Sequence, residues 1–534
     1  MKPILRLSAV FLLLGISFSL LSQNVGIGVD PPLHKLDVAG DINLSAGSKY
    51  LIDNATVLQY PGNFNIFIGD EAGKDNTTGE RGVFIGYQAG HHNTSGGHNI
   101  NIGYKAGFYD TTGQYNTNLG YMAGFNNIIG TNNTMIGYQT GYDNVADYNT
   151  FIGYKAGNQN QNGEYGTFIG DRAGYFNTSG VRNTFLGYQA GYDNDNGNNN
   201  IYIGYRAGSS NTTGSGNMAI GYLAGFNNTA TNNTFIGYES GYSVTTGAEN
   251  TLIGFQSGRN TTGGNNVFLG FKAGFNCTSG NNNILIGCNA GENRSGDQGI
   301  MIGYAAGKNN TRNGNVYIGH AAGEQDTTGQ DNVFIGPYAG QLNGPGQNNV
   351  YVGSNSGKNC IANNNVFIGY LSGLTDSTGA SNVFIGCYSG MDNKVGQENV
   401  LIGRGAGENT TTNNNVMVGS GAGGNNISGH SNTYLGHWAG INATGNNNIF
   451  IGDQAGMNES GSGKLYIANS NTTEPLIYGD FPSKVVKIHD VLKLKPISTA
   501  PSVSGAGDAG IMYIDASDNN TLKVWDGTTW QSCW

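Results

Sequence analysis

Apolar and polar residues alternate along this chain in a pattern that returns every 16 or 17 residues. An Ile-Gly dipeptide, or its Leu or Val variant, occurs 24 times between Ile68-Gly69 and Ile451-Gly452, and a second glycine follows each one four residues later. A period this short allows one thin coil of chain per repeat, and the coils must stack to bury their apolar side chains. The pattern predicts an all-β parallel solenoid, or β-roll, of 24 coils over residues 65–457.

Two columns of branched residues indicate one short strand in each coil. The residue before the motif glycine is Ile, Leu or Val in all 24 repeats, and the residue three before it is Ile, Val or Thr in 23. Side chains two positions apart share one face of a strand, so we expect these columns to fill the coil interior. The two glycines should mark a corner, with the small residue before the second glycine in a narrow interior.

Asn stands four residues before the motif glycine in 21 repeats, and Gly82, Gly166 and Gly299 replace it in the others. Stacked Asn side chains can form hydrogen bonds along the axis of a β-stack. This column therefore predicts a polar ladder at the entrance to each strand.

The column two before the glycine should face outward by the same alternation, and it holds large apolar residues in 21 repeats. Along a rod of about 115 Å, at about 4.8 Å per coil, such a stripe exceeds an ordinary exposed patch. We therefore expect a parallel, in-register homo-oligomer. Alternatively, a turn reverses the parity and these residues fill the core. The aromatic members of the predicted inter-subunit stripe are Phe67, Phe84, Phe151, Phe168, Phe185, Tyr202, Phe235, Phe268, Tyr317, Phe334, Tyr351, Phe367, Phe384, Tyr434 and Phe450.

A second aromatic column follows the motif glycine, where Tyr or Phe occurs in 13 repeats. One interpretation is a stacking ladder that stiffens the rod. The other is a strip that binds sugars or surfaces, because Tyr offers a flat apolar face with a polar tip.

Composition excludes several classes of function. The net charge is −10 and the Lys and Arg residues are scattered, so no basic stripe predicts a nucleic-acid partner. His91, His92 and His98 fall in one loop, but no Cys or carboxylate lies at metal-ligand spacing in the sequence, and no metal or cofactor is predicted. No cluster of acids and bases suggests catalysis, so we expect a protein that is not an enzyme.

The five cysteines predict no disulfide. Cys277 and Cys360 share one column, and Cys288 and Cys387 share another, but the members of each pair lie five or six coils apart. That separation of about 24 to 29 Å is too long for a disulfide bond. Cys533 is a candidate for a cross-link between chains.

The N-terminal residues 1–22 are typical of a secretory signal peptide. Lys2 and Arg6 precede a mostly apolar run that is shorter than the roughly 20 residues of a spanning helix. The sequence therefore predicts an exported, secreted or surface-located protein without a helical membrane anchor, associated with the outer membrane by a route that the sequence does not identify.

The flanks divide into an N-terminal β or linker segment (23–64), a closing segment (458–504) and a small C-terminal β module (505–534). In this module Asp526-Gly527 predicts a two-residue hairpin turn between 522–525 and 528–530, and 511–514 is a candidate third strand. The module's tryptophans either face a ligand or pack within the hairpin. They are Trp525, Trp530 and Trp534.

Repeats such as Asn149-Thr150-Phe151-Ile152-Gly153-Tyr154 resemble the head repeats of YadA-like trimeric autotransporter adhesins, over residues 65–457. The resemblance implies a left-handed parallel β-roll in which three chains pack side by side, and attachment to cells, extracellular matrix or glycans. The repeat here is longer than is usual in that family, and the sequence predicts neither its coiled-coil stalk nor its membrane barrel. Residues 24–32 and 464–470 look like flanking segments of tail-fibre-like proteins of Bacteroidetes.

Two other functions stay open at this point. Threonines recur seven or eight residues after many motif glycines, and a flat Thr array can match an ice or crystal lattice. Its members are Thr77, Thr94, Thr111, Thr178, Thr212 and Thr261. The other alternative is a purely structural fibre or spacer.

Overall fold

The computed structural model describes residues 63–503 and 505–533, together with the backbone of four short strands before them. These are β1 (Val25–Ile27), β2 (Leu36–Val38), β3 (Lys49–Ile52) and β4 (Ala55–Gln59). Strands β1 and β2 pair in parallel, and β3 and β4 pair antiparallel. The predicted signal peptide, most of the segment 23–64, and Trp534 lie outside the described residues.

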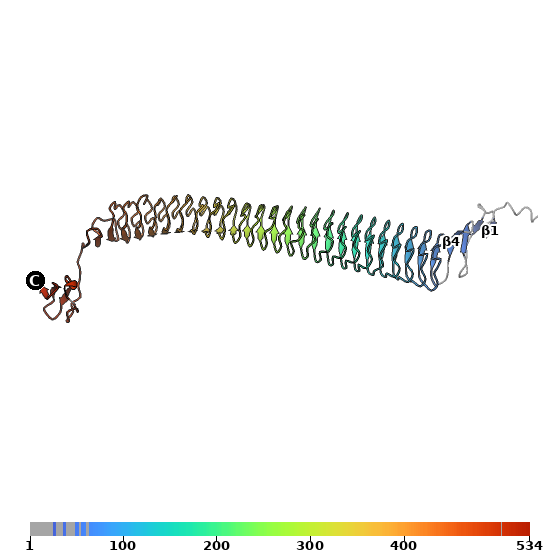
Figure 1. The fold of residues 1–534 in the computed structure, drawn as a ribbon, viewed down its shortest axis with the longest axis horizontal. Coiled ribbons are helices and arrows are strands. Elements are labelled where there is room, and N and C mark those ends of the chain that lie inside the picture. Colours follow the sequence, from blue (N-terminus) through green and yellow to red (C-terminus); the bar gives the residue numbers. More distant parts are fainter. Residues whose placement is uncertain are drawn as a thin grey trace, which may run out of the picture. The chain divides into compact units, whose positions relative to one another are not determined.

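The prediction of an all-β parallel solenoid is confirmed, with one three-residue strand in each of about 24 turns (Figure 1). The chain divides into an N-terminal unit that ends at Thr229 and a C-terminal unit that begins at Ala230. The strands of the N-terminal unit are β5 (Ile66–Ile68), β6 (Val83–Ile85), β7 (Ile100–Ile102), β8 (Thr117–Leu119), β9 (Thr134–Ile136), β10 (Thr150–Ile152), β11 (Thr167–Ile169), β12 (Thr184–Leu186), β13 (Ile201–Ile203) and β14 (Met218–Ile220).

The C-terminal unit continues the same architecture. Its solenoid strands are β15 (Thr234–Ile236), β16 (Thr251–Ile253), β17 (Val267–Leu269), β18 (Ile284–Ile286), β19 (Ile300–Ile302), β20 (Val316–Ile318), β21 (Val333–Ile335), β22 (Val350–Val352), β23 (Val366–Ile368), β24 (Val383–Ile385), β25 (Val400–Ile402), β26 (Val416–Val418), β27 (Thr433–Leu435) and β28 (Ile449–Ile451). Within each unit every strand pairs in parallel with the same column of the next turn, as Phe151 does with Phe168 and Phe367 with Phe384.

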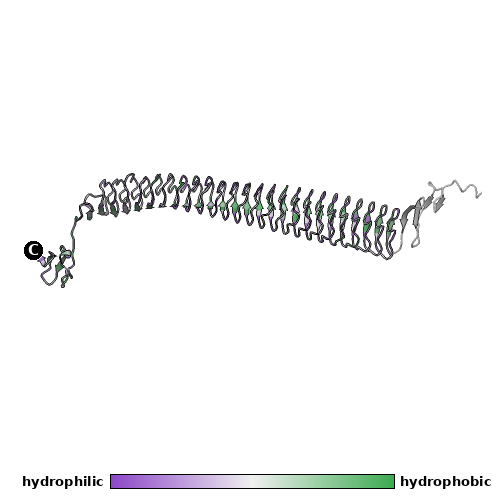
Figure 2. Ribbon diagram, in the orientation of Figure 1, coloured by the Kyte–Doolittle hydropathy of each residue, from purple (hydrophilic) through white to green (hydrophobic). Residues whose placement is uncertain are grey.

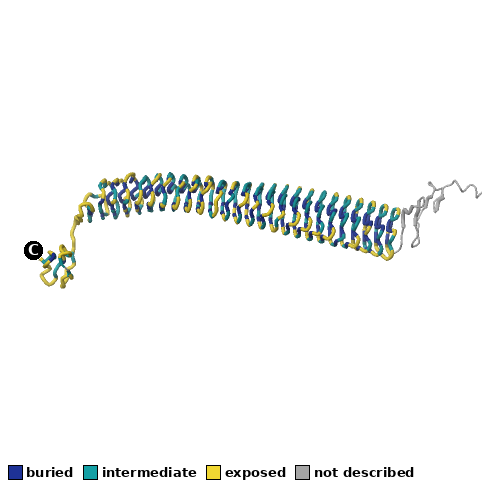
Figure 3. The backbone as a smooth tube through the Cα atoms, in the orientation of Figure 1, coloured by how far each residue is buried: buried dark blue, intermediate teal, exposed yellow. Residues whose placement is uncertain are grey.

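The predicted direction of the strand side chains is wrong. The middle residue of each strand points into the coil, and the Phe and Tyr side chains of the predicted inter-subunit stripe are at most 1% exposed. The flanking branched residues, such as Val366 and Ile368, lie on the outside and are half-buried or exposed. Figure 3 shows the buried positions recurring in coil after coil. The aromatic column is therefore the core of a single chain, which is the alternative with reversed parity.

The two glycines of each repeat explain why the middle residue of each strand can point into the coil. Gly86 has a φ of 130°, and a Cβ there would lie 2.5 Å from the Gly103 carbonyl oxygen of the next turn. Gly90 has a φ of 57°, and a Cβ there would lie 2.8 Å from the Phe84 ring. Both positions need the conformational freedom of glycine, and the second makes room for the inward aromatic ring. Ala89, just before it, is fully buried, as the sequence predicts.

The interior aromatic rings form stacks along the coil axis. The ring centroids of Phe168 and Phe185 lie 4.7 Å apart with an interplanar angle of 13°. Those of Phe367 and Phe384 lie 4.6 Å apart with an interplanar angle of 6°. Figure 2 shows the hydrophobic residues recurring at the strands of successive turns. In the turns that have an aromatic residue at this position, one ring therefore fills most of a coil that is too thin for a second layer of side chains.

The predicted Asn ladder forms hydrogen bonds along the axis, but mainly to backbone groups. The Asn116 backbone N–H donates to the Asn99 side-chain oxygen at 2.9 Å, and the Asn99 amide donates to the Gly113 carbonyl oxygen at 2.7 Å. A second ladder that the sequence analysis missed occupies the seventh position after the motif glycine. There the Asn177 amide donates to Asn160 at 2.7 Å and the Asn194 amide to Asn177 at 2.6 Å. These ladders satisfy polar groups that the narrow coil buries.

Antiparallel strands follow the solenoid. Strand β29 (Lys464–Ile467) pairs in parallel with β28 and antiparallel with β30 (Ile477–Asp480), which pairs with β31 (Val485–Ile488). The C-terminal module begins with a 3₁₀ turn, Ala506–Asp508, followed by the antiparallel strands β32 (Met512–Asp515), β33 (Thr521–Trp525) and β34 (Trp530–Ser532).

The candidate third strand of the module is confirmed by β32, but the predicted two-residue hairpin is wrong. The loop between β33 and β34 has four residues, because the Asp526 carboxylate accepts hydrogen bonds from the backbone N–H groups of Thr528 and Thr529. These bonds hold 528–529 in the turn and delay the strand to Trp530. Among the residues that the structure describes, no helix is long and apolar enough to cross a membrane.

Candidate binding surfaces

The outer face of the solenoid strands is an apolar surface in each unit. Of the two outward columns, the one before the motif glycine contains only Ile, Leu and Val, and the other adds Thr and one Met; neither contains a charged residue. In the C-terminal unit the most exposed members, between 37% and 47%, are Val267, Leu269, Ile284, Ile335, Ile368, Val416 and Leu435. The aromatic stripe is thus inside the coil, and the two columns of mainly branched residues lie on the surface instead.

The Tyr column after the motif glycine forms the stacked ladder of the first interpretation. The Tyr121 ring stacks on Tyr104 with a centroid distance of 5.1 Å and an interplanar angle of 8°. It stacks on Tyr138 with a centroid distance of 5.0 Å and an angle of 4°. Each is about 40% exposed. Because the ring faces are covered by neighbouring rings, the ladder presents ring edges and hydroxyl groups outward. A sugar ring therefore has no free aromatic face to stack on within the ladder.

The Thr array is engaged in the fold itself. The hydroxyl groups of Thr77 and Thr94 donate to carbonyl oxygens of the following turn at 2.8 and 3.0 Å, and Thr261 is fully buried. The protons of these two hydroxyl groups are used within the fold, and the burial of Thr261 interrupts the exposed array. The observation gives no support to the ice-binding alternative.

The described tryptophans of the C-terminal module pack against other side chains of the module. Trp530 lies 4.7 Å from Tyr513 and 5.5 Å from Trp525, measured between ring centroids. The Trp525 indole N–H donates to the Gly505 carbonyl oxygen at 3.0 Å. Both rings remain half-buried, so packing within the module accounts for them, as the second interpretation predicts.

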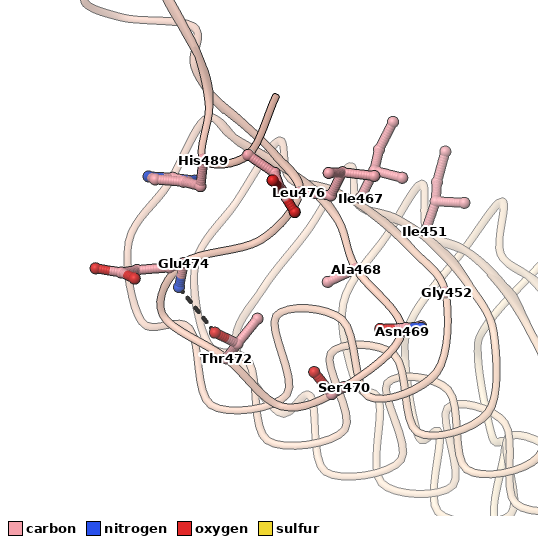
Figure 4. Close-up of a pocket in the computed structure, with 11 residues that line it drawn as sticks. Ile451, Gly452, Ile467, Ala468, Asn469, Ser470, Thr472, Glu474, Leu476 and His489 are labelled. Carbon is pink, nitrogen blue, oxygen red and sulfur yellow. Dashed lines mark hydrogen bonds between the residues drawn. The ribbon is translucent and has the colours of Figure 1, made fainter. Parts of the chain in front are cut away.

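A pocket of about 550 Å³ lies where the last solenoid turn meets the antiparallel strands (Figure 4). The Glu474 backbone N–H donates to the Thr472 hydroxyl at 3.0 Å, and His489 Nδ1 lies 2.7 Å from the Pro475 carbonyl oxygen. In Figure 4 the side chains of Glu474 and His489 point away from Asn469. The pocket has titratable residues in its lining but does not bring them together.

The buried ladder at the seventh position contains acids that sequence reasoning did not single out. Burial raises the pKa of Asp376 to about 8 and that of Asp326 to about 6, and it raises the pKa of Asp110 well above its ordinary value. The same column places the thiols of Cys277 and Cys360 in the interior, and all five cysteines are free. These groups have no access to solvent, so they belong to the core and not to a catalytic site.

The one cluster of metal-ligand type among the described residues lies at the corner of the first two turns. It comprises Asp75, His91 and His92, whose ligand atoms all lie within 4.8 Å of one another. No carboxylate lies at metal-ligand spacing along the sequence, as predicted, but stacking of the turns brings Asp75 of the preceding turn to the two histidines. The repeat length itself carries the missing signal, since 17 residues separate Asp75 from His92 and place them in one column.

Two electrostatic features distinguish this corner. Burial lowers the pKa of His91, and the neighbouring His92 lowers it further. Hydrogen bonds from Lys74 and Gln88 lower the pKa of Glu71 to about 2, so its carboxylate stays ionised. His98 is not part of the cluster: its ring stacks on Tyr115 at 4.8 Å and its Nε2 lies 3.1 Å from an Arg81 guanidinium nitrogen.

Comparison with known proteins adds no relative to this description. No protein-family model matches the chain, and no curated protein matches it.

Proposed function

We propose that this chain is a non-enzymatic, surface-exposed attachment fibre whose solenoids associate side by side through the outer faces of their strands. The observation that carries the proposal is the pair of uncharged, branched columns on that face. In the C-terminal unit these columns run over fourteen strands, β15 to β28. Thirteen intervals of about 4.8 Å make an apolar strip about 62 Å long.

Such a strip is large for the surface of a monomer. With a width of about 10 Å its area in projection is about 600 Å², the upper end of the range for the largest apolar patch on a monomeric protein. The ten strands of the N-terminal unit carry a strip of their own. A second copy of the chain fits this surface better than an unrelated partner, because its columns have the same spacing and the same lack of charge. We further propose three copies, which is the number implied by the resemblance to adhesin head repeats.

Disulfide trapping tests this arrangement. In a chain whose native cysteines are replaced by Ala, Ile335→Cys on the outer face should give covalently linked chains on oxidation. Around a shared three-fold axis, identical residues of neighbouring chains come close together. Thr328→Cys, at an exposed loop position of the preceding turn, is the matched control and should remain unlinked. Equal cross-linking of the two variants, or none in either, would refute the proposed interface.

Attachment to cells, matrix or glycans is the second part of the proposal. It rests on the resemblance and on the row of Tyr hydroxyl groups that the stacked ladder presents at intervals of about 5 Å. Binding to a glycan array should survive deletion of residues 505–534, and it should decrease when Tyr104, Tyr121 and Tyr138 are changed to Phe. Loss of all binding on deletion of 505–534, with no effect of the Phe changes, would place the contact in the C-terminal module instead.

A further inference from the structure

The corner where the first two turns meet brings two imidazole rings onto a pair of carboxylates. His92 Nδ1 lies 2.7 Å from Asp75 Oδ2, and His91 Nδ1 lies 3.8 Å from the same oxygen. On the far side of His91, Nε2 lies 3.3 Å from Glu71 Oε2. The cluster thus joins residues 71 and 75 of one turn to residues 91 and 92 of the next.

The backbone of the solenoid holds these groups in place. The Asp75 N–H donates to the His91 carbonyl oxygen, and the His92 N–H donates to the Phe108 carbonyl oxygen, both at 3.0 Å. The imidazole rings also stack on aromatic rings of the third turn, His91 on Phe108 at 5.1 Å and His92 on Tyr109 at 5.2 Å. Two rings are therefore fixed from above by aromatic side chains and face carboxylates below.

His91 has a free ligand atom in this setting. The residue is 7% exposed, and its Nδ1 is buried without a hydrogen-bond partner. Buried ring nitrogens normally have a partner, because a polar atom that loses its hydrogen bonds to water and gains none in the fold is destabilising. Glu71 can accept the proton of Nε2, which leaves the lone pair on Nδ1 directed toward Asp75. A carboxylate behind a histidine ligand is the usual outer-sphere arrangement of zinc sites.

We propose that Asp75, His91 and His92 bind a late first-row divalent metal ion such as Zn²⁺, with Glu71 as the outer-sphere partner of His91. Two imidazole nitrogens and one carboxylate oxygen suit Zn²⁺, Ni²⁺ or Cu²⁺, whereas Ca²⁺ and Mg²⁺ prefer oxygen ligands alone. Metal–ligand bonds of about 2.0–2.2 Å place tetrahedral ligand atoms about 3.4 Å apart. The 2.7 Å contact between His92 and Asp75 must therefore open, and the wider separations, of up to 4.8 Å, must close. His92 gives up its hydrogen bond to Asp75 and uses Nδ1 for the metal, while its proton resides on Nε2.

The charges at the corner favour a cation. Asp75 and Glu71 supply two negative charges, and Lys74 offsets one of them through its ion pair with Glu71 at 2.7 Å. The site lies at the turn corner, away from the outward strand columns of the proposed interface. Metal binding and association of chains therefore make separate predictions.

Titration of the full chain with Zn²⁺, followed by calorimetry, tests the site. We expect one ion per chain, with the visible d–d bands of a low-coordinate Co²⁺ complex when Co²⁺ replaces Zn²⁺. Asp75→Asn, His91→Gln and His92→Gln should each weaken binding by more than about 100-fold, and Glu71→Gln by about 10–100-fold, the loss typical of an outer-sphere partner. Unchanged far-UV circular dichroism shows that these variants remain folded.

The chain provides its own matched control. His437 Nδ1 lies 2.7 Å from Asp453 Oδ1, as His92 Nδ1 does from Asp75 Oδ2, but the residue before His437, where the cluster has its second histidine, is Gly436. Asp453→Asn should leave the Zn²⁺ affinity unchanged. Binding that is as tight in the triple variant Asp75→Asn, His91→Gln, His92→Gln as in the native chain would overturn the proposal, and so would the absence of binding in the native chain.

Discussion

Within strand β23 Phe367 is fully buried, whereas the next residue, Ile368, keeps 38% of its surface exposed. Both are large and apolar, and both belong to columns that recur in turn after turn. The inner column is completed by its own chain, through rings that stack at 4.6 to 4.9 Å on either side of Phe367. Ile368 of the outer column also lies between its counterparts of the neighbouring turns, Val352 and Ile385, but its outer surface stays partly exposed. Hydrophobicity alone therefore does not distinguish the inner from the outer face of a strand in a thin solenoid.

The largest expected effect comes from removing an inner ring. Phe367→Ala should lower the local free energy of unfolding by about 3–5 kcal/mol, because it removes a buried side chain and leaves a cavity. Ile368→Ala, on the outer face of the same strand, should cost less than about 1 kcal/mol within a single chain. Native-state hydrogen exchange of the amides in β22 to β24 measures both. Equal losses would show that the two faces do not differ as described.

A smaller loss of stability should follow when a larger side chain replaces the glycine beside the buried guanidinium of Arg294. Arg294 is fully buried, and its guanidinium donates to side-chain oxygens of Asn283 and Asn310 at 2.9 and 2.6 Å. A Cβ at Gly299 would lie 2.3 Å from the Arg294 Cζ atom, which explains why glycine replaces the usual Asn there. Gly299→Asn should therefore cost about 1–3 kcal/mol through overpacking.

A double-mutant cycle sharpens this prediction. In the Arg294→Asn background, Gly299→Asn restores the common pair of residues and should cost much less than it does alone. Hydrogen exchange in β18 and β19 reports the local stability of each variant. Strictly additive costs would contradict the steric account of Gly299.

A third effect, which is absent at low pH, is a dependence of stability on pH. Burial raises the pKa of Asp376 in the folded chain to about 8, from the ordinary value of 3.8 for an Asp carboxyl. As the pH rises from about 4 to about 8, the unfolded chain loses this proton first, so this group makes the fold progressively less stable over that range. Asp376→Asn should flatten the decline, since the Asn carbonyl oxygen can still accept the Gly379 N–H at the position where Asp376 does so at 2.8 Å.

The control for this prediction is a carboxylate on the surface. Glu398 is exposed, and Glu398→Gln should leave the pH profile of the native chain unchanged. Denaturant midpoints recorded between pH 4 and pH 9 provide the comparison. A profile that stays as steep in Asp376→Asn as in the native chain would show that this carboxyl is not the group responsible.

The sequence predicts the fold class and the strand positions because the Ile-Gly period is strict. It does not determine which face of the strand turns inward, because three consecutive residues are apolar in most turns and alternation applies equally well to either face. Two residues indicate which face of the strand points inward. The glycine at position 90 leaves room for the Phe84 ring, and Thr replaces the branched aliphatic residue in the flanking column at Thr117 and elsewhere, as suits a half-exposed site.

The His cluster shows a different limit. His91 and His92 are adjacent in the sequence, whereas Asp75 lies one full turn earlier, so a search for ligands along the chain misses it. Only the register of the stacked turns brings the three together. By contrast, Trp525 and Trp530 lie on strands as the sequence predicts, but the contact of Trp530 with Tyr513 depends on a four-residue loop that the Asp526 carboxylate sets.

Sedimentation equilibrium of the chain that begins at Gln23 measures whether three copies associate. We expect a mass of three chains for the native sequence and of one chain for the triple variant Ile335→Glu, Ile368→Glu, Ile402→Glu, which places charges on the outer face. The exposed-loop control Thr328→Glu, Gln347→Glu, Gln397→Glu should retain the native mass. A native chain that sediments as a monomer, or an assembly that the outer-face charges leave intact, would contradict the account.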